Sequence, residues 1–399
     1  MRYSASSASG RYYRPELDVV RFLAFLLVFL NHTLPSKNHP DIRIDHLLGA
    51  FAPLFYGSLG VTRYGLSLFF VLSAFLICEL LLREREIAGT IAIKQFYIRR
   101  ILRIWPLYYF VLTLGVMVAL LPGGNRSEIA DIGWFAIFMG AWHSSLFGFI
   151  GNPVVPLWSI SVEEQFYLIA PWAIKYFSRK SLYGFCAVLV SVASVECYHL
   201  GRISATWYRI WGDSLVQFEC FAAGILLCLM LRGRMPRILL WQRLILIFIW
   251  GVCWEASDYE LHYRYIHASV SSGCWPLIGS YALAPLGSVL VLVAFLGVTP
   301  KLLPRWAIHL GRISFGLYVY HEFALAILHH FQLDYFRLAD VPFYPLRAFM
   351  TAGLSLGLPF GLTVLMAALS YRYIETPFLR MKTRHAVIQT QPSGALSDR

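Results

Sequence analysis

The chain has 399 residues, of which 58% are hydrophobic and 14% are charged, whereas soluble domains are usually about half apolar and a quarter charged. The net charge of +12 would suit a nucleic-acid-binding protein, but Lys and Arg gather in short loops between long apolar runs, as in the cytoplasmic loops of membrane proteins. The composition excludes an ordinary soluble domain and predicts an integral membrane protein with no nucleic-acid partner.

Apolar segments long enough to cross a bilayer recur along the chain. A helix of about 20 apolar residues spans the hydrocarbon core and satisfies its own backbone groups, for which lipid offers no partner. No repeat relates the two halves, so an inverted-repeat transporter gains no support. The prediction is an all-α polytopic membrane helix bundle with about 10 transmembrane helices. The predicted spans are 17–35, 61–82, 102–121, 157–177, 182–199, 214–231, 239–255, 276–298, 308–330 and 346–371.

Basic residues set the orientation of these spans. Arg14 precedes the first span, and further Lys and Arg clusters follow the second, fourth, sixth, eighth and last spans. All clusters face the cytoplasm only if the apolar segment 132–148 does not cross the membrane. Glycines and Pro153 flank this segment, so we expect it to be re-entrant or partly buried, whereas an eleven-span alternative would place one basic cluster outside. Both termini are then cytoplasmic.

The first span carries polar residues in a region where a charge costs about 2.5–3.5 kcal/mol even on mild scales. Asp18 and Arg21 lie near its cytoplasmic end, and His32 lies beyond its middle. Arg21 and His32 are three helical turns apart, so they share a face with a separation of roughly 16 Å along the axis. His32 is either a hydrogen-bonded packing residue or a base that accepts a proton from a hydroxyl near neutral pH.

An arginine-rich segment precedes the third span. It contains Arg99, Arg100 and Arg103, and the last two lie on one helical face because they are three residues apart. Guanidinium groups bind phosphate well, and a nucleotide thioester such as coenzyme A would bring phosphates from the cytoplasm. A plain positive-inside anchor explains the same residues, and the sequence leaves both interpretations open.

Two adjacent acids, Glu163 and Glu164, lie near the start of the span 157–177. Adjacent helical residues diverge by about 100°, so at most one of them faces the bundle interior. Both acids could lie among headgroups near a helix N-terminus. Alternatively, Glu163 enters the bundle from the outer side, toward which His32 reaches. We predict that Glu163 or Asp18 orients the His32 imidazole and raises its basicity.

A further charged pair, His321 and Glu322, falls near the middle of the span 308–330, which is costly unless both face a polar cavity. No metal-ligand or disulfide spacing is visible around the seven cysteines, and no metal site is predicted. The polar cavity is also expected to contain the hydroxyl groups of Ser73, Ser161, Tyr167 and Tyr318.

Taken together, these motifs resemble the membrane-bound acyltransferase family 3, whose members O-acylate sugars, cell-wall glycans, Nod factors and macrolides. Each motif alone is weak, but their occurrence in the family's order over residues 14–380 is specific. The motifs are Arg14-Pro15-Glu16-Leu17-Asp18 with Arg21 and His32, then Leu68–Ile77, Arg99–Pro106, Leu157–Tyr167, Ser314–His321 and Ile374–Pro377.

The resemblance implies roles for individual residues. His32 would be the essential histidine and Arg21 its motif partner. Arg100 and Arg103 would lie on the acyl-CoA side, where Arg21 and Arg99 are also expected to bind the donor. Glu163 would be the acid of the glutamate motif. The chain departs from the family pattern at several positions. Val19 and Val20 replace a common Gly-Leu pair, and Ala74 replaces a common glycine. Glu322 stands where an aromatic residue is common.

The resemblance also implies one transmembrane acyltransferase domain over residues 14–384, between disordered cytoplasmic ends at 1–13 and 385–399. We expect acyl-CoA, above all acetyl-CoA, as the donor substrate and no tightly bound cofactor. The acceptor would be a carbohydrate or glycoconjugate. The protein would lie in a bacterial inner membrane, in contact with its lipid. His32 would deprotonate the acceptor hydroxyl, which attacks the thioester directly or through a transient acyl group. The alternative is a transporter or flippase, which would move its substrate without consuming acyl-CoA.

Overall fold

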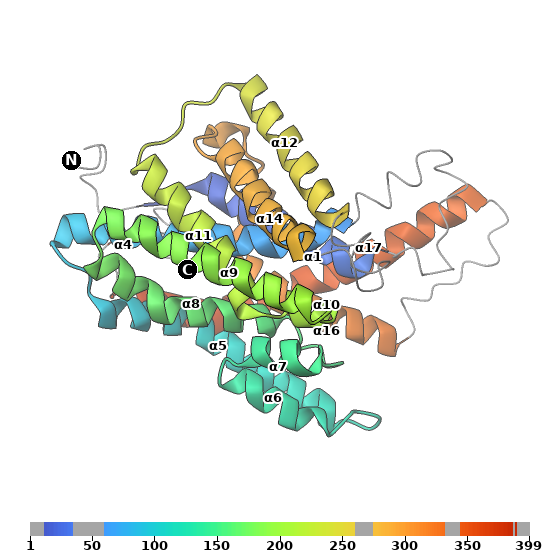
Figure 1. The fold of residues 1–399 in the computed structure, drawn as a ribbon. Helices are drawn as coiled ribbons and strands as arrows, with labels where there is room; N and C mark the ends of the chain where they lie inside the picture. Colours follow the sequence, from blue (N-terminus) through green and yellow to red (C-terminus); the bar gives the residue numbers. More distant parts are fainter. Residues whose placement is uncertain (1–11, 35–59, 260–273, 332–343, 386–387, 389–399) are drawn as a thin grey trace.

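The described part of the chain is helical throughout its regular structure. In the computed structural model of the protein, no strand occurs among these residues (Figure 1), in agreement with the predicted all-α class. The structure describes residues 12–34, 60–259, 274–331, 344–385 and 388.

Each predicted span has a helical counterpart. The long helices are α1 (Pro15–Thr33), α4 (Gly65–Ala88), α5 (Ile93–Leu120), α8 (Leu157–Tyr176), α9 (Arg179–Arg202), α11 (Ser214–Leu231), α12 (Leu240–Tyr259), α14 (Cys274–Phe295), α16 (Ser314–His330) and α17 (Tyr344–Ser370). The shorter elements are η2 (Val61–Tyr64), α6 (Glu128–Ala136), α7 (Gly140–Phe147), α10 (Trp207–Trp211), η4 (Pro300–Leu302), α15 (Arg305–Arg312), the π-helical turn η5 (Tyr371–Glu375) and α18 (Thr376–Thr383).

Several of these helices are suited to a bilayer. Within the described residues, five helical segments are long and apolar enough to cross a membrane: Val61–Ala88, Ile93–Leu120, Arg179–Arg202, Ser214–Leu231 and Cys274–Phe295. Other helices differ in charge or length, since α1 contains Glu16, Asp18 and Arg21, and α16 has only 17 residues. The structure supports a membrane protein with several spans, and the number of about ten crossings stays a prediction.

Helix α4 lies at the centre of the packing. It contacts α1, α8, α11 and α14, and Figure 1 shows it running beside α11. A Cβ added at Gly224 of α11 would clash with the backbone carbonyl of Val71 on α4, so only glycine permits this close approach. Phe166 of α8 stacks on Phe221 of α11 with ring centroids 4.2 Å apart. These contacts fix α4 and α8, which both carry site residues.

The segment 132–148 is irregular, as predicted. It contains most of α6 and all of α7, joined through Phe138 in the left-handed region at φ 58°. Figure 1 shows α6 and α7 together at the lower edge of the molecule, beside the long helices. His143 lies 3.0 Å from Asp131 and links the two short helices. The segment is therefore a helical hairpin and not a continuous span.

The predicted span 308–330 is divided in two. Helix α15 ends at Arg312 and α16 begins at Ser314. A Cβ at Gly311 would clash with the carbonyl oxygen of Asp18 on α1, so the α15 backbone lies directly against α1. This contact places α15 as a separate short helix beside the N-terminal end of α1.

The predicted disordered ends contribute some packed residues. Tyr12 is buried, and Tyr13 donates a hydrogen bond to Asp18 at 3.1 Å. At the other end, the His385 carbonyl accepts a hydrogen bond from Arg99, and Ile388 is buried. The ordered domain thus extends slightly beyond the predicted limits, while the rest of both predicted ends, apart from these residues, lies outside the described part of the chain.

Candidate active site

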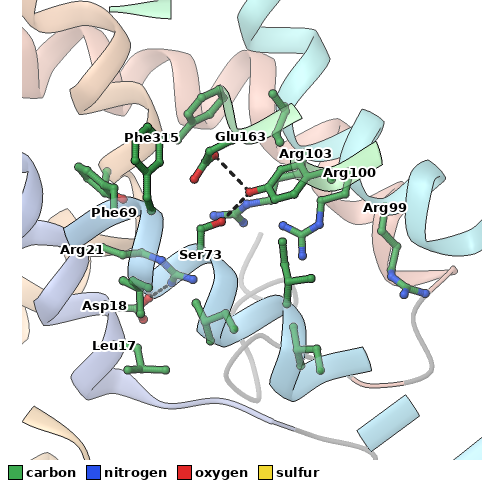
Figure 2. A pocket seen from close by; sticks show the side chains of 18 of the residues that line it. Leu17, Asp18, Arg21, Phe69, Ser73, Arg99, Arg100, Arg103, Glu163 and Phe315 are labelled. Carbon is green, nitrogen blue, oxygen red and sulfur yellow. Dashed lines mark hydrogen bonds and ion pairs between the residues drawn. The ribbon is translucent and has the colours of Figure 1, made fainter. Parts of the chain in front are cut away.

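A pocket opens between the first residues of α1, the interior of α4, the start of α5, and parts of α8, α16 and α18. Its apolar wall includes Phe69 and Phe315. Figure 2 shows Arg21, Arg100 and Glu163 around the same space, with Arg99 at its edge. The basic residues that line it are Arg14, Arg21, Arg99, Arg100, Arg103 and Lys382, so the pocket is strongly cationic.

Two of these cations are neutralised by neighbouring acids. Arg21 donates to Asp18 at 2.6 Å. Arg99 donates to Glu84 at 2.7 Å and to the His385 carbonyl at 2.9 Å. Arg99 therefore links α5 to α4 and to the residues after α18. It has this structural role in addition to lining the pocket.

Three other cations have no such partner. Within the described residues, Arg100, Arg103 and Lys382 make no hydrogen bond or ion pair, and Arg100 lies over the Tyr167 ring at 5.3 Å. Burial, and then the charges of Arg103 and the neighbouring arginines, lower the pKa of Lys382 well below its usual range. Glu163 and Glu375 act on these arginines electrostatically without a hydrogen bond or ion pair. Cations held close together in this way form a site that an anion of several charges would stabilise.

Glu163 lines this pocket and is hydrogen-bonded to a chain of two hydroxyl groups. Tyr167 donates to the Glu163 carboxylate at 3.2 Å, and Ser73 of α4 lies 2.7 Å from the Tyr167 hydroxyl. Because the tyrosine proton is used on Glu163, Ser73 is the donor in the second bond. Figure 2 shows Glu163 and Ser73 with the dashed lines of these two interactions between them. The predicted residues Glu163, Tyr167 and Ser73 are thus brought together.

Tyr318 marks the inner end of the pocket. Its hydroxyl lies 2.7 Å from the Ser159 hydroxyl and donates to the Pro156 carbonyl at 3.2 Å. Phe69 packs edge-on against the Tyr318 ring at 5.8 Å. Tyr318 and His321 are three residues apart on α16, so one helical turn separates the pocket from the second polar cluster.

The second cluster consists of His32, His321 and Glu322, which we call the His–His–Glu cluster. His32 Nδ1 forms an ion pair with the Glu322 carboxylate and lies 2.9 Å from His321 Nε2. The Nδ1 atom of His321 lies 2.5 Å from the Tyr318 carbonyl. His321 is fully buried, whereas the His32 side chain is 34% exposed, so the cluster opens toward the C-terminal end of α1.

The predicted pairing of His32 with Glu163 or Asp18 is wrong. The carboxylate that contacts His32 is Glu322. Glu163 lies nearly two turns inside α8 and faces Ser73, and Asp18 is engaged by Arg21 and Tyr13 at the opposite end of α1. Arg21 and His32 share α1 as predicted, but they belong to different ends of the site.

Other residues have different positions from those expected. Ser161 is buried and donates to the Leu157 carbonyl of its own helix at 3.2 Å, so it does not line the pocket. Sequence reasoning missed Lys382 and Ser159, which line the pocket, and it did not predict the burial of Glu375. The π-helical turn that ends at Glu375 is a feature that often marks functional sites, but the sequence carries no signal for it.

Comparison with known proteins identifies relatives. The sequence model of acyltransferase family 3, described as an acyltransferase domain, matches residues 14–368. A Staphylococcus aureus protein provisionally named an O-acetyltransferase is 24% identical over 92% of this chain and 57% of its own length. The chain therefore spans little more than half the length of this relative.

Other relatives match a shorter part. The peptidoglycan O-acetyltransferase OatA of Listeria monocytogenes is 30% identical over 41% of this chain and 24% of its own length. A Caenorhabditis elegans protein named regulator of hypoxia-inducible factor 1 is 31% identical over 39% of the chain and 33% of its own length. No solved structure gives a significant match.

Proposed function

The chain belongs to acyltransferase family 3, and on that premise we propose that it moves an acyl group from acyl-CoA to a hydroxyl group within the membrane. The observation that carries this proposal is the proximity of two unlike sites. A cationic pocket, suited to phosphate, ends at Tyr318, one turn of α16 from the histidine–carboxylate pair of His32 and Glu322.

The cationic pocket fits the donor. Arg100, Arg103 and Lys382 line the pocket and would bind the phosphates of coenzyme A, since none of the three forms an ion pair with an acid among the described residues. Arginine binds phosphate through paired N–H groups. The long arm of the donor would extend past Ser73 and Phe69 toward Tyr318, which places the thioester near the His–His–Glu cluster.

The cluster fits the chemistry. The Nδ1–H of His32 donates to Glu322, which leaves Nε2 free to accept a proton. His32 Nε2 removes the proton of the acceptor hydroxyl as its oxygen forms a bond to the thioester carbonyl carbon. The carbon–sulfur bond then breaks, and the same proton passes from His32 to the departing thiolate. An acyl ester and free coenzyme A result.

The acceptor follows from chemistry and from the names of relatives. His32 lies near the C-terminal end of α1 and is partly exposed. In the predicted orientation this is the outer end, so an acceptor presented from the outer side would reach it. A peptidoglycan O-acetyltransferase is among the relatives. We therefore propose a carbohydrate or glycoconjugate hydroxyl as acceptor and acetyl as the acyl group.

The test is thiol release from acetyl-CoA by purified protein with glycan acceptors. His32→Ala should lower kcat by at least about 100-fold, since general acid–base catalysis contributes roughly 10²–10⁴-fold. His330→Ala is the matched control, because His330 is an exposed histidine of α16 away from the cluster. Wild-type turnover in folded His32→Ala would reject His32 as the base. Substrate movement without thiol release by the wild type would instead favour a transporter.

A further inference from the structure

The His–His–Glu cluster brings three possible metal-ligand atoms close together. These atoms are His32 Nδ1, His321 Nε2 and Glu322 Oε1, and all lie within 4.8 Å of one another. His321 Nε2 is 2.9 Å from His32 Nδ1 and 3.5 Å from Glu322 Oε1. Ligands of a tetrahedral Zn²⁺ ion stand roughly 3.3 Å apart, given metal–ligand bonds of about 2.0–2.1 Å.

The protonation of His321 supports a cation at this point. The Tyr318 carbonyl can only accept, so His321 Nδ1 carries the proton and donates it. The Nε2 lone pair of His321 therefore faces His32 and Glu322. A proton on His32 Nδ1 cannot satisfy both neighbours fully, whereas a divalent cation would bind all three atoms.

The surroundings match those of metal-binding histidines. Such histidines usually donate their second N–H to a carbonyl or carboxylate, which fixes the ring, and Tyr318 serves His321 in this way. His321 is fully buried, while the side chains of His32 and Glu322 are 34% and 23% exposed. A cation could enter from this side and keep a water molecule as its fourth ligand.

We propose that His32, His321 and Glu322 form a Zn²⁺-binding site and that Zn²⁺ inhibits the acyl transfer proposed above. A metal on His32 Nδ1 leaves the remaining ring proton on Nε2, so Nε2 can no longer accept a proton from the acceptor. The inhibition rests on the proposed function, whereas the binding of Zn²⁺ does not. The sequence showed no such site because the ligands come from α1 and α16, far apart along the chain.

The experiment uses tag-free, chelator-treated full-length protein titrated with Zn²⁺ against a chromophoric chelator. Wild type and His330→Ala should bind one equivalent. His321→Ala and Glu322→Gln should bind at least about 100-fold more weakly, since losing even an outer-shell partner of a metal costs roughly 10–100-fold. X-ray absorption of the wild-type complex should show two imidazole ligands.

Three outcomes separate the two proposals. Absence of a zinc equivalent, or equal affinity in His321→Ala, Glu322→Gln and wild type, overturns the site. Stoichiometric binding through these residues with no acyl transfer by the metal-free enzyme supports the site and rejects the proposed function. Acceleration of acyl transfer by Zn²⁺ overturns the inhibitory role.

Discussion

At the residue scale, Glu322 places a carboxylate against His32 at the partly exposed end of the cluster. Replacing it in Glu322→Gln keeps the side-chain size but removes the charge that stabilises a protonated imidazole. We expect kcat in metal-free buffer to fall by roughly 100-fold, within the range of general acid–base catalysis, while KM for the acyl donor stays unchanged. Steady-state kinetics with varied acetyl-CoA measures both quantities.

The conservative replacement Glu322→Asp serves as the control for charge. It should recover part of the lost kcat because a carboxylate is restored, although at a shorter reach. If Glu322→Gln retains wild-type kcat, Glu322 does not orient the base.

The position of Glu322 also shows what sequence reasoning could and could not reach. His32 and Arg21 were found because charged residues in an apolar span are costly. The partner of His32 was missed because it lies on another helix, and no local spacing relates the two. From the residues alone, Glu163 was paired with His32 on assumed depth, and depth depends on where α8 begins and how it packs against α4.

The arginines allow a comparison between binding and structural roles. Arg100 has no hydrogen bond or ion pair among the described residues, whereas Arg99 binds Glu84. We expect Arg100→Ala to raise KM for the donor by roughly 10-fold or more, since a hydrogen bond to a charged group contributes about 1.5–3 kcal/mol.

Arg99→Ala should behave differently, because it leaves the buried Glu84 carboxylate without its cation. Loss of one partner of a buried pair destabilises a protein by about 3–5 kcal/mol, so its thermal unfolding temperature in detergent should fall more than that of Arg100→Ala. An unchanged donor KM in folded Arg100→Ala would remove Arg100 from the donor site.

At the element scale, the contact between α1 and α15 depends on Gly311. A Cβ there would overlap the Asp18 carbonyl oxygen, so α15 would have to move away from α1. Gly311→Ala should destabilise the protein by about 1–3 kcal/mol, the usual range for overpacking, measured by thermal unfolding. The shift would also disturb Arg312, which donates to Tyr13 beside Asp18.

Gly184 of α9 is the matched control, since a Cβ at this exposed helical position meets nothing within 4 Å. Gly184→Ala should be neutral or stabilising because alanine favours helix over glycine by about 1 kcal/mol. Equal destabilisation by both substitutions would show that the close contact between α15 and α1 is not what makes Gly311→Ala destabilising.

Helices were easier to predict than their interruptions. Apolar runs predicted the positions of α8, α11 and α14 within a few residues, because lipid permits few alternatives to a helix. The division between α15 and α16 was missed because it arises from the contact of Gly311 with a distant helix. Hydropathy within one segment carries no information about such a contact.

At the scale of the whole molecule, the part of the pocket lined by Arg21 and the His–His–Glu cluster lie toward opposite ends of α1. Arg21 lines the cationic pocket and His32 belongs to the His–His–Glu cluster, with a separation of roughly 16 Å along the helix. The enzyme would thus receive its donor from the cytoplasm and its acceptor nearer the outer side. This arrangement requires the start of α5 to face the cytoplasm.

The orientation can be tested with introduced cysteines, because all seven native cysteines are buried and should react little. Arg126 and Arg234 are exposed, and Arg126 follows the end of α5 opposite the pocket. Helix α5 has 28 residues, or about 42 Å at 1.5 Å per residue, enough to cross the bilayer. Arg126→Cys should therefore react with a membrane-impermeant maleimide in intact cells, and Arg234→Cys only after permeabilisation. The reverse pattern would place the cationic pocket on the outer side, where cytoplasmic acyl-CoA could not reach it.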